Sequence, residues 1–356
     1  MIALNIPARA HAQERFVTRL VDSGESTDQD SILVTQLGNR KIYSGRWGLF
    51  ELTQLDEDID GDVVAVDPQL GVAERLVRSA SDHNTFLVTE RCDQLCIMCS
   101  QPPKKTHVDR WEEFRRAALL SPFGKTIGLS GGEPTLYKHD LFDMLDEVLS
   151  QRPDLSFHVL SNGQHFDKSD LRRLRSPAYS RVVWGIPMYS ADPNIHDDIV
   201  AKQGAHERLR DSLAIMLEAG SHIELRTVII SSNISGIPRL AEYVASHLGF
   251  IDQWSIMQLE AIGFAKHRFS DLVVDAEGYF SFISQAIDIA QLFGVTAALF
   301  NFTLCSVPPD YRKYALPSIS DWKRKYAPGC EDCSAREECS GFFAWHPEEA
   351  MTVTPI

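Results

Sequence analysis

Three of the seven cysteines lie close together in one short segment. Cys92, Cys96 and Cys99 follow the spacing C-x3-C-x2-C in the sequence TERCDQLCIMCSQPP. Three thiolates on one short loop can bind three irons of a cubane [4Fe–4S] cluster, and the fourth iron then keeps an open coordination site. A zinc site is the alternative, and it needs four ligands. His83 could be the fourth, but it lies on the far side of the strand-like segment before the cysteines. We therefore expect an iron–sulfur cluster with one reactive iron.

The other four cysteines lie in the C-terminal part of the chain. Cys330, Cys333 and Cys339 follow the spacing C-x2-C-x5-C, and Cys305 lies upstream of them. Four thiolates can saturate a second [4Fe–4S] cluster or bind one structural zinc ion, and the spacing leaves both open. The two sets use all seven cysteines. No cysteine is then left as a thiol that could donate a hydrogen atom to a substrate radical.

Strand-like and helix-like segments alternate from about residue 84 onward. Apolar, β-branched runs predict strands, and apolar residues at three- and four-residue spacing predict helices. The expected strands are 85–89, 125–129, 155–160, 181–188, 222–230 and 253–259, and the expected helices are 108–120, 140–149, 168–174, 206–217, 238–248 and 276–293. Six βα units predict an α/β fold with a parallel sheet and right-handed crossovers. Since eight units would close a barrel, six favour a partial (β/α)6 TIM-like barrel with catalytic groups on the loops after its strands.

The two ends of the chain depart from this alternation. Short alternating runs at 32–37, 42–43 and 63–66 predict a small β-rich N-terminal domain, which we expect to follow an N-terminal helix. From about residue 301 the chain is rich in proline, cysteine and charge and has no long periodic run. We therefore expect three domains: a β-rich domain at 1–80, a core at 81–298 and a short cysteine-rich domain at 299–356.

Charge and composition exclude several classes of function. The chain has 35 Lys and Arg against 49 Asp and Glu, a net charge of −14 that disfavours nucleic acid as a partner. No apolar stretch reaches the ~18 residues of a membrane span, and the first residues lack the apolar core of a signal peptide. Without an export signal, seven cysteines indicate thiols or metal ligands rather than disulfides. We expect a cytoplasmic protein with no membrane partner.

The cysteine triad after the first strand of a six-unit partial barrel resembles the radical S-adenosylmethionine (SAM) superfamily. The resemblance implies that the open iron of the cluster binds the amino and carboxylate groups of SAM. It further implies that an electron from the cluster, supplied by a flavodoxin or ferredoxin, cleaves SAM to methionine and a 5′-deoxyadenosyl radical.

A glycine-rich turn at the end of the second predicted strand strengthens this resemblance. There the sequence reads Gly131, Gly132, Glu133 and Pro134, and the resemblance implies that Glu133 binds the methionine ammonium of SAM. Arg226 is implied to pair with the SAM carboxylate. The remaining cofactor-binding residues implied at the strand ends are Ser161, Asn162, Tyr189 and Ser190 for ribose, and Gln258 and Glu260, with Gly263 beyond, for adenine.

The C-terminal cysteines resemble the SPASM and twitch extensions of radical SAM enzymes, which implies one auxiliary [4Fe–4S] cluster. His83 and Asn84, the run CSQPPKK and the tail SISDWKRKYAPGC together resemble the His-Xaa-Ser system radical SAM maturases, HxsC. That resemblance implies hydrogen abstraction from a ribosomally made precursor peptide, followed by oxidation or cross-linking. A partner maturase would be a further interaction, and the N-terminal domain would hold the peptide leader by adding a strand to its sheet edge.

Two other interpretations remain open from the sequence. One is a radical SAM enzyme that acts on a small metabolite or on another enzyme. The other is a non-catalytic iron–sulfur or zinc protein that binds a partner.

Overall fold

The computed structural model describes residues 3–356. The chain divides into two compact units, each made of two stretches. Unit 1 contains Met1–Thr89 and Val108–His158, and unit 2 contains Glu90–His107 and Val159–Ile356. No described helix is both long and apolar enough to cross a membrane.

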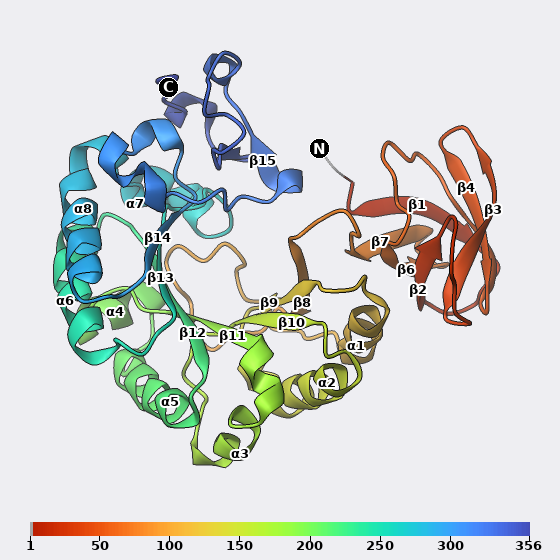
Figure 1. Ribbon diagram of the computed structural model, residues 1–356, viewed down its shortest axis with the longest axis horizontal. Coiled ribbons are helices and arrows are strands. Elements are labelled where there is room, and N and C mark those ends of the chain that lie inside the picture. The colour runs from red at the N-terminus through yellow and green to blue at the C-terminus, as the bar shows by residue number, and fades with distance from the viewer. Residues whose placement is uncertain (1–2) are drawn as a thin grey trace. The chain divides into compact units, whose positions relative to one another are not determined.

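Unit 1 begins with a closed β-barrel, drawn in red and orange in Figure 1. Its strands pair in the order β1-β5-β4-β3-β2-β6-β7. Their bounds are β1 Asn5–Ala10, β2 Phe16–Val21, β3 Asp30–Leu37, β4 Arg40–Gly45, β5 Gly48–Leu52, β6 Val63–Asp67 and β7 Val72–Val77. The β-rich N-terminal region was therefore predicted correctly from its alternating runs.

The expected N-terminal helix is wrong, because β1 and β2 occupy that part of the chain. Ile6 and Ala8 are buried, whereas Asn5, Pro7 and Arg9 are exposed, which is the two-residue period of a strand with one buried face. β1 pairs with both β5 and β7, so the barrel satisfies its backbone hydrogen bonds on both sides. Tertiary pairing therefore decides the conformation of this segment.

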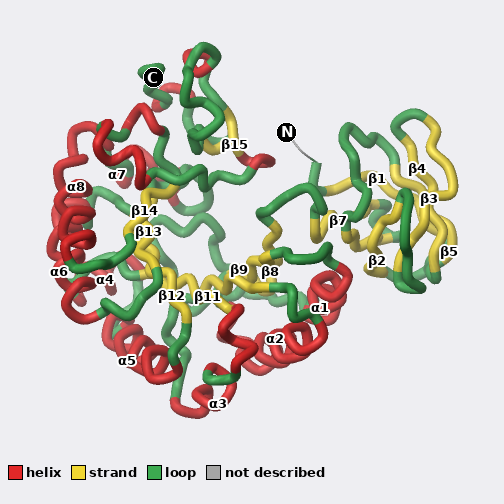
Figure 2. The backbone as a smooth tube through the Cα atoms, in the orientation of Figure 1, coloured by secondary structure: helices red, strands yellow, loops and turns green. Residues whose placement is uncertain are grey.

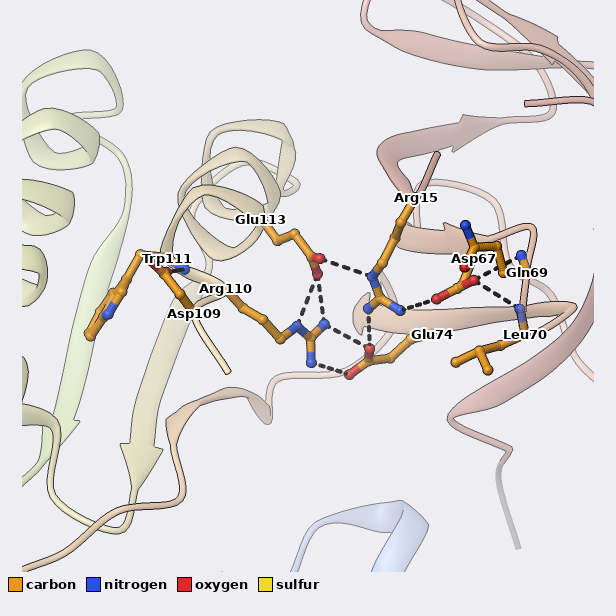
Figure 3. Close-up of polar contacts among 9 residues, drawn as sticks. All are labelled: Arg15, Asp67, Gln69, Leu70, Glu74, Asp109, Arg110, Trp111 and Glu113. Atoms are coloured by element: carbon orange, nitrogen blue, oxygen red, sulfur yellow. Dashed lines mark hydrogen bonds and ion pairs between the residues drawn. The ribbon is translucent and has the colours of Figure 1, made fainter. Parts of the chain in front are cut away.

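Within unit 1, the barrel is joined to α1 (Trp111–Leu120) by a network of ion pairs (Figure 3). Arg15 donates to Glu113 at 2.9 Å and to Glu74 at 2.6 Å. Arg110 donates to Glu74 at 2.7 Å and to Glu113 at 2.9 Å, so each carboxylate bridges both arginines. Networks of partly buried pairs of this kind are stronger than isolated surface pairs.

The rest of unit 1 starts the parallel sheet. β8 (Asn84–Thr89) pairs in parallel with β9 (Thr126–Gly131), and α1 connects them. α2 (Lys138–Gln151) follows β9 and buries one apolar face, including Leu141, Leu145 and Val148. This is the βαβα pattern that the periodicity predicts.

The complete parallel sheet has seven strands in the order β14-β13-β12-β11-β10-β9-β8. The later strands are β10 Ser156–Leu160, β11 Val182–Pro187, β12 His222–Val228, β13 Gln253–Met257 and β14 Ala297–Phe300, and the later helices are α3 Leu171–Leu174, α4 Pro193–Val200, α5 Ala205–Ala219, α6 Ile237–His247, α7 Phe269–Leu272 and α8 Ala276–Leu292. All six predicted strands are confirmed. β14 and α4 were not predicted, because four and eight residues are too short for a clear period.

The C-terminal stretch of unit 2 consists mostly of loops and short 3₁₀ turns (Figure 2). Its one strand pair joins β15 (Arg324–Lys325) to β16 (Phe342–Phe343). This agrees with the lack of a long periodic run in the sequence.

Candidate functional site

The cysteine triad lies in unit 2 on the loop that follows β8. The loop runs beside the end of α4, where Leu95 N–H donates to the Val200 carbonyl at 3.2 Å and Ile97 N–H to the Ile199 carbonyl at 2.9 Å. Cys99 N–H donates to the Cys96 carbonyl at 3.0 Å, which folds the last two cysteines into one turn. The backbone therefore holds this loop in a defined conformation.

The three sulfurs are close enough to influence one another. Burial, together with the nearby Cys99 and Cys92 sulfurs, raises the pKa of the Cys96 thiol above its ordinary value. A cationic iron cluster would favour the thiolate forms and remove this mutual repulsion. Soft thiolate donors grouped in this way fit an iron–sulfur cluster.

The sulfurs do not converge as ligands of a single ion do. Among residues 3–356, no group of three His, Cys, Asp or Glu side chains is placed to hold one metal ion. In a cubane each cysteine binds a different iron, so its sulfurs lie farther apart than those around one zinc.

Glu133 lies in unit 1 at the end of β9. Its side chain is fully buried, and Oε1 accepts a hydrogen bond from the Thr135 N–H at 2.8 Å. It caps the 3₁₀ helix Pro134–Tyr137. Position 131, two residues before Glu133, requires a glycine, because a Cβ there would lie 2.4 Å from the Thr89 carbonyl oxygen. The glycine thus allows the turn to pack against the last residue of β8 and to place the carboxylate.

The loop after β10 contains the predicted ribose residues Ser161 and Asn162. Ser161 Oγ accepts from the Gly163 N–H at 3.0 Å. Asn162 Nδ2 donates to Asp93 Oδ1 at 2.8 Å, and its Oδ1 accepts from the Gln164 N–H at 3.1 Å. The structure therefore directs the Asn162 amide toward the cysteine loop, a contact that the sequence analysis did not anticipate.

Tyr189 and Ser190 follow β11. Burial and the nearby Cys96 and Cys99 sulfurs raise the pKa of the Tyr189 phenol well above its ordinary value, so this ring lies beside the cysteines. Its ring stacks on His196 with centroids 5.7 Å apart. Ser190 Oγ accepts from the Asp192 N–H at 3.0 Å, so it also shapes its own loop.

Arg226 on β12 has a partner that the sequence analysis missed. Its Nη1 donates to Glu224 Oε2 at 2.7 Å, and Ser255 on β13 also bonds to the Glu224 carboxylate. Glu224 is buried and lies two residues from Arg226, on the same face of β12. Two charged residues at this spacing in an apolar strand were the available signal.

The predicted adenine residues follow β13. Gln258 N–H donates to the Phe300 carbonyl at 3.1 Å, and burial raises the pKa of Glu260, an effect that the charge of Lys323 opposes. Gln258 lines a cavity of about 300 Å³ in unit 2, together with Cys305 and His346. The cavity therefore reaches from the end of β13 to one of the C-terminal cysteines.

Gly263 contacts the cysteine loop directly. A Cβ at this position would lie 2.3 Å from the Cys99 carbonyl oxygen and 2.6 Å from that of Ser100. Phe264 N–H then donates to the Cys99 carbonyl at 2.8 Å. The segment after β13 thus packs against the backbone of the third cysteine.

The four C-terminal cysteines lie together despite their separation in the chain. One small apolar cavity is lined by all four of them, Cys305, Cys330, Cys333 and Cys339. Burial, followed by the nearby Cys305, Cys339 and Cys333 sulfurs, raises the pKa of Cys330. The Leu304 N–H donates to Cys339 Sγ at 3.3 Å, a contact that would stabilise a thiolate ligand.

Residues 86–244 match the family model of the Radical SAM superfamily. The chain contains a radical SAM domain. Its matched range holds the cysteine triad, Glu133 and Arg226, whereas Gln258, Glu260 and the four C-terminal cysteines lie beyond it.

Several solved structures are similar to part of this chain. SuiB from Streptococcus suis, bound to S-adenosylmethionine, is 14% identical with a TM-score of 0.51, and the match covers 63% of this chain and 51% of SuiB. SuiB bound to the precursor peptide SuiA is 14% identical with a TM-score of 0.49, and the match covers 63% of this chain and 49% of that SuiB chain. The protein anSMEcpe with bound AdoMet is 16% identical with a TM-score of 0.48, and the match covers 60% of this chain and 62% of anSMEcpe.

The chain spans about half the length of the SuiB structures it matches. No curated protein matches it in sequence.

Proposed function

We propose that the protein is a radical SAM maturase that modifies a ribosomally made precursor peptide. The observation that carries the proposal is the C-x3-C-x2-C loop directly after the first strand of a radical SAM domain. Cys92, Cys96 and Cys99 would hold a [4Fe–4S] cluster, which would supply the open iron and the electron for the cleavage of SAM. An external electron donor of the flavodoxin or ferredoxin type reduces it. The fold around this site is a partial (β/α)6 barrel.

The chain's own residues bind and orient SAM. Glu133 is a buried anion suited to the methionine ammonium, and Arg226, held by Glu224, is suited to the carboxylate. The ribose would lie beside Ser161, Asn162, Tyr189 and Ser190, and the adenine would lie beside Gln258 and Glu260. Tyr189 excludes water beside the cysteines, because its ring is buried there.

The second cysteine set holds one auxiliary [4Fe–4S] cluster, which supplies an electron acceptor. The support is that all four thiols line one small apolar cavity. The predicted twitch-like domain at 299–356 would thus form around this cluster rather than around an apolar core. The other predicted boundaries, 1–80 and 81–298, are retained in this proposal.

A peptide is the proposed substrate for two reasons. SuiB, which shares the fold at a TM-score of 0.51, binds the precursor peptide SuiA. The cavity of about 300 Å³ between Gln258 and Cys305 is large enough for a side chain of such a peptide. Abstraction of one hydrogen atom, followed by loss of one electron and one proton, would leave a product two mass units lighter. A His-Xaa-Ser peptide is the proposed type.

Anaerobic reconstitution tests the cofactors. Two [4Fe–4S] clusters correspond to about eight irons per chain. We expect Cys92→Ala to retain about four irons and to form no 5′-deoxyadenosine, while Cys333→Ala loses the other four and still cleaves SAM. If the wild-type chain bound zinc and did not cleave SAM, the proposed enzymatic activity would be refuted. Co-expression with a candidate peptide, followed by mass spectrometry, tests the substrate, and an unmodified or epimerised peptide of unchanged mass would contradict the oxidation.

The N-terminal barrel is the proposed leader-binding domain. β3 pairs with β2 at residues 30–32, and its further residues, 33–37, pair with β4. The other edge of β3 there can accept an added strand, next to the exposed side chains of Val34 (58%) and Leu37 (61%). Lysine at both positions should weaken peptide binding, whereas Leu70→Lys, at an equally exposed site in the β6–β7 turn, should not. Equal peptide affinities would exclude this edge.

A further inference from the structure

The cysteine loop carries a carboxylate of its own that has partners from two other loops. Asp93 directly follows the first cysteine of the triad. Its Oδ1 accepts from Asn162 Nδ2 at 2.8 Å, and its Oδ2 lies 3.1 Å from His165 Nε2. Lys202 forms a close ion pair with the same Oδ2. Asp93 and Lys202 are each only 25% exposed, so solvent screens this pair incompletely.

The residues that reach Asp93 are held in place by their own loops. Lys202 follows α4, and its N–H donates to the Asp197 carbonyl at 3.0 Å. The buried Asp197 carboxylate accepts from the N–H groups of Gly204 (2.5 Å) and His206 (2.8 Å), which fixes the connection from α4 to α5. The lysine is therefore presented to Asp93 by a preorganised turn.

The charge state of Asp93 follows from these contacts. Lys202 and His165 both face Oδ2, and Asn162 donates to Oδ1, so both oxygens of the carboxylate have partners suited to an anion. Asp93 is thus an anion within the cysteine loop. An anion beside an iron–sulfur cluster disfavours reduction, and a paired cation offsets that effect.

We propose that Lys202 and Asp93 are positioning residues that anchor the cysteine loop and balance the charge beside the cluster it holds. This inference rests on the proposed function, because the cluster is part of it. Lys202 ties the loop to the end of α4, and Asn162 and His165 tie it to the end of β10. The ion pair keeps the loop in place without leaving an uncompensated charge at the reducible group.

The sign of two potential shifts tests the charge balance. In Lys202→Met the Asp93 anion loses its cation, so the midpoint potential of the cluster should fall. In Asp93→Asn the lysine is left as an uncompensated cation, so the potential should rise. Lys202→Arg and the double variant Asp93→Asn/Lys202→Met should remain near the wild type. Potentials are measured by electron paramagnetic resonance during a redox titration without SAM. Shifts of the same sign, or none, would overturn the charge balance.

Hydrogen exchange of the cluster-free chain tests the anchor separately. Amides of residues 90–107 should exchange about three- to tenfold faster in Lys202→Met and Asp93→Asn, the range for a partly screened ion pair. Lys202→Arg should not change them, nor should Lys168→Met, which removes an exposed lysine after β10. Unchanged exchange in all variants would overturn the anchor. A wild-type chain that binds no iron would instead refute the proposed function, and exchange would still decide the anchor.

Discussion

Glu133 is fully buried although it carries a carboxylate. Buried carboxylates are costly unless they accept hydrogen bonds or meet a cation. The Thr135 N–H, at 2.8 Å, and the Thr135 hydroxyl both donate to Oε1. An ammonium group bound beside this carboxylate would form a charge-assisted hydrogen bond with it. At the scale of one residue, this is the feature of unit 1 that points most directly to a cationic amine as ligand.

Replacing Glu133 by glutamine should weaken SAM binding about ten- to a hundredfold. Glutamine keeps an oxygen that can accept from Thr135 but loses the charge, and a charged hydrogen bond contributes about 1.5–3 kcal/mol. The measurement is equilibrium dialysis of SAM against the reconstituted protein, with iron content as a check on folding. Thr135→Val, which leaves the carboxylate in place, is the control. Equal SAM affinity in Glu133→Gln and the wild type would contradict the assigned role.

At the scale of elements, the segment after β13 supports the cysteine loop through a glycine. Gly263 has φ +62°, a conformation that side chains rarely adopt, and it leaves no room for a Cβ beside the Cys99 carbonyl. The sequence analysis placed this glycine at the adenine. The structure shows its backbone role directly, and that role requires contact between residues far apart in the chain.

Gly263→Ala should therefore impair assembly of the first cluster. The added Cβ must displace the backbone of Cys99 and Ser100, so we expect a loss of up to about half of the reconstituted iron with the C-terminal site retained. Gly236→Ala is the matched control, since nothing lies within 4 Å of a Cβ there. Iron analysis and absorption spectra of both variants distinguish the outcomes. Full iron in Gly263→Ala would show that the loop accommodates the methyl group.

At the scale of the whole molecule, unit 2 contains a buried histidine that should limit its stability in acid. His196 on α4 is 1% exposed, and its Nδ1 lies 3.3 Å from the Tyr189 N–H, which donates to it. Burial, and then the neighbouring His206, lower the pKa of His196 to about 4. The folded protein therefore holds the neutral form.

The free energy of unfolding should fall as the pH drops from about 6.5 toward 4. The unfolded chain binds a proton on this histidine near 6.5, whereas the folded chain resists it until about 4, so the contribution is complete above 6.5 and is lost below. The loss should be on the order of 3 kcal/mol, measured by urea denaturation at several pH values. His196→Gln should reduce this dependence, and His139→Gln, at an exposed site, should not. An unchanged slope in His196→Gln would exclude His196 as the cause.

The secondary structure of the core could be read from the sequence because it depends on local periodicity. The six predicted strands and the helices that follow them bury apolar side chains at regular intervals. This spacing is visible in a single sequence. The prediction for the start of the chain was wrong for the opposite reason. β1 carries too few apolar residues to show its period, and its partners in β5 and β7 lie forty or more positions away in the chain.

The sequence by itself determined that three cysteines lie close together on one short loop, because the C-x3-C-x2-C spacing needs only local geometry. The match of residues 86–244 to the Radical SAM family model also depends on the sequence alone. Tertiary structure decided what surrounds them. It brings Cys305 to the other three C-terminal cysteines, pairs Arg226 with Glu224, and directs Asn162 and Lys202 to Asp93. Contacts of this kind join loops that follow different strands, and the parallel sheet, which gathers the carboxyl ends of its strands at one edge, is what makes them neighbours.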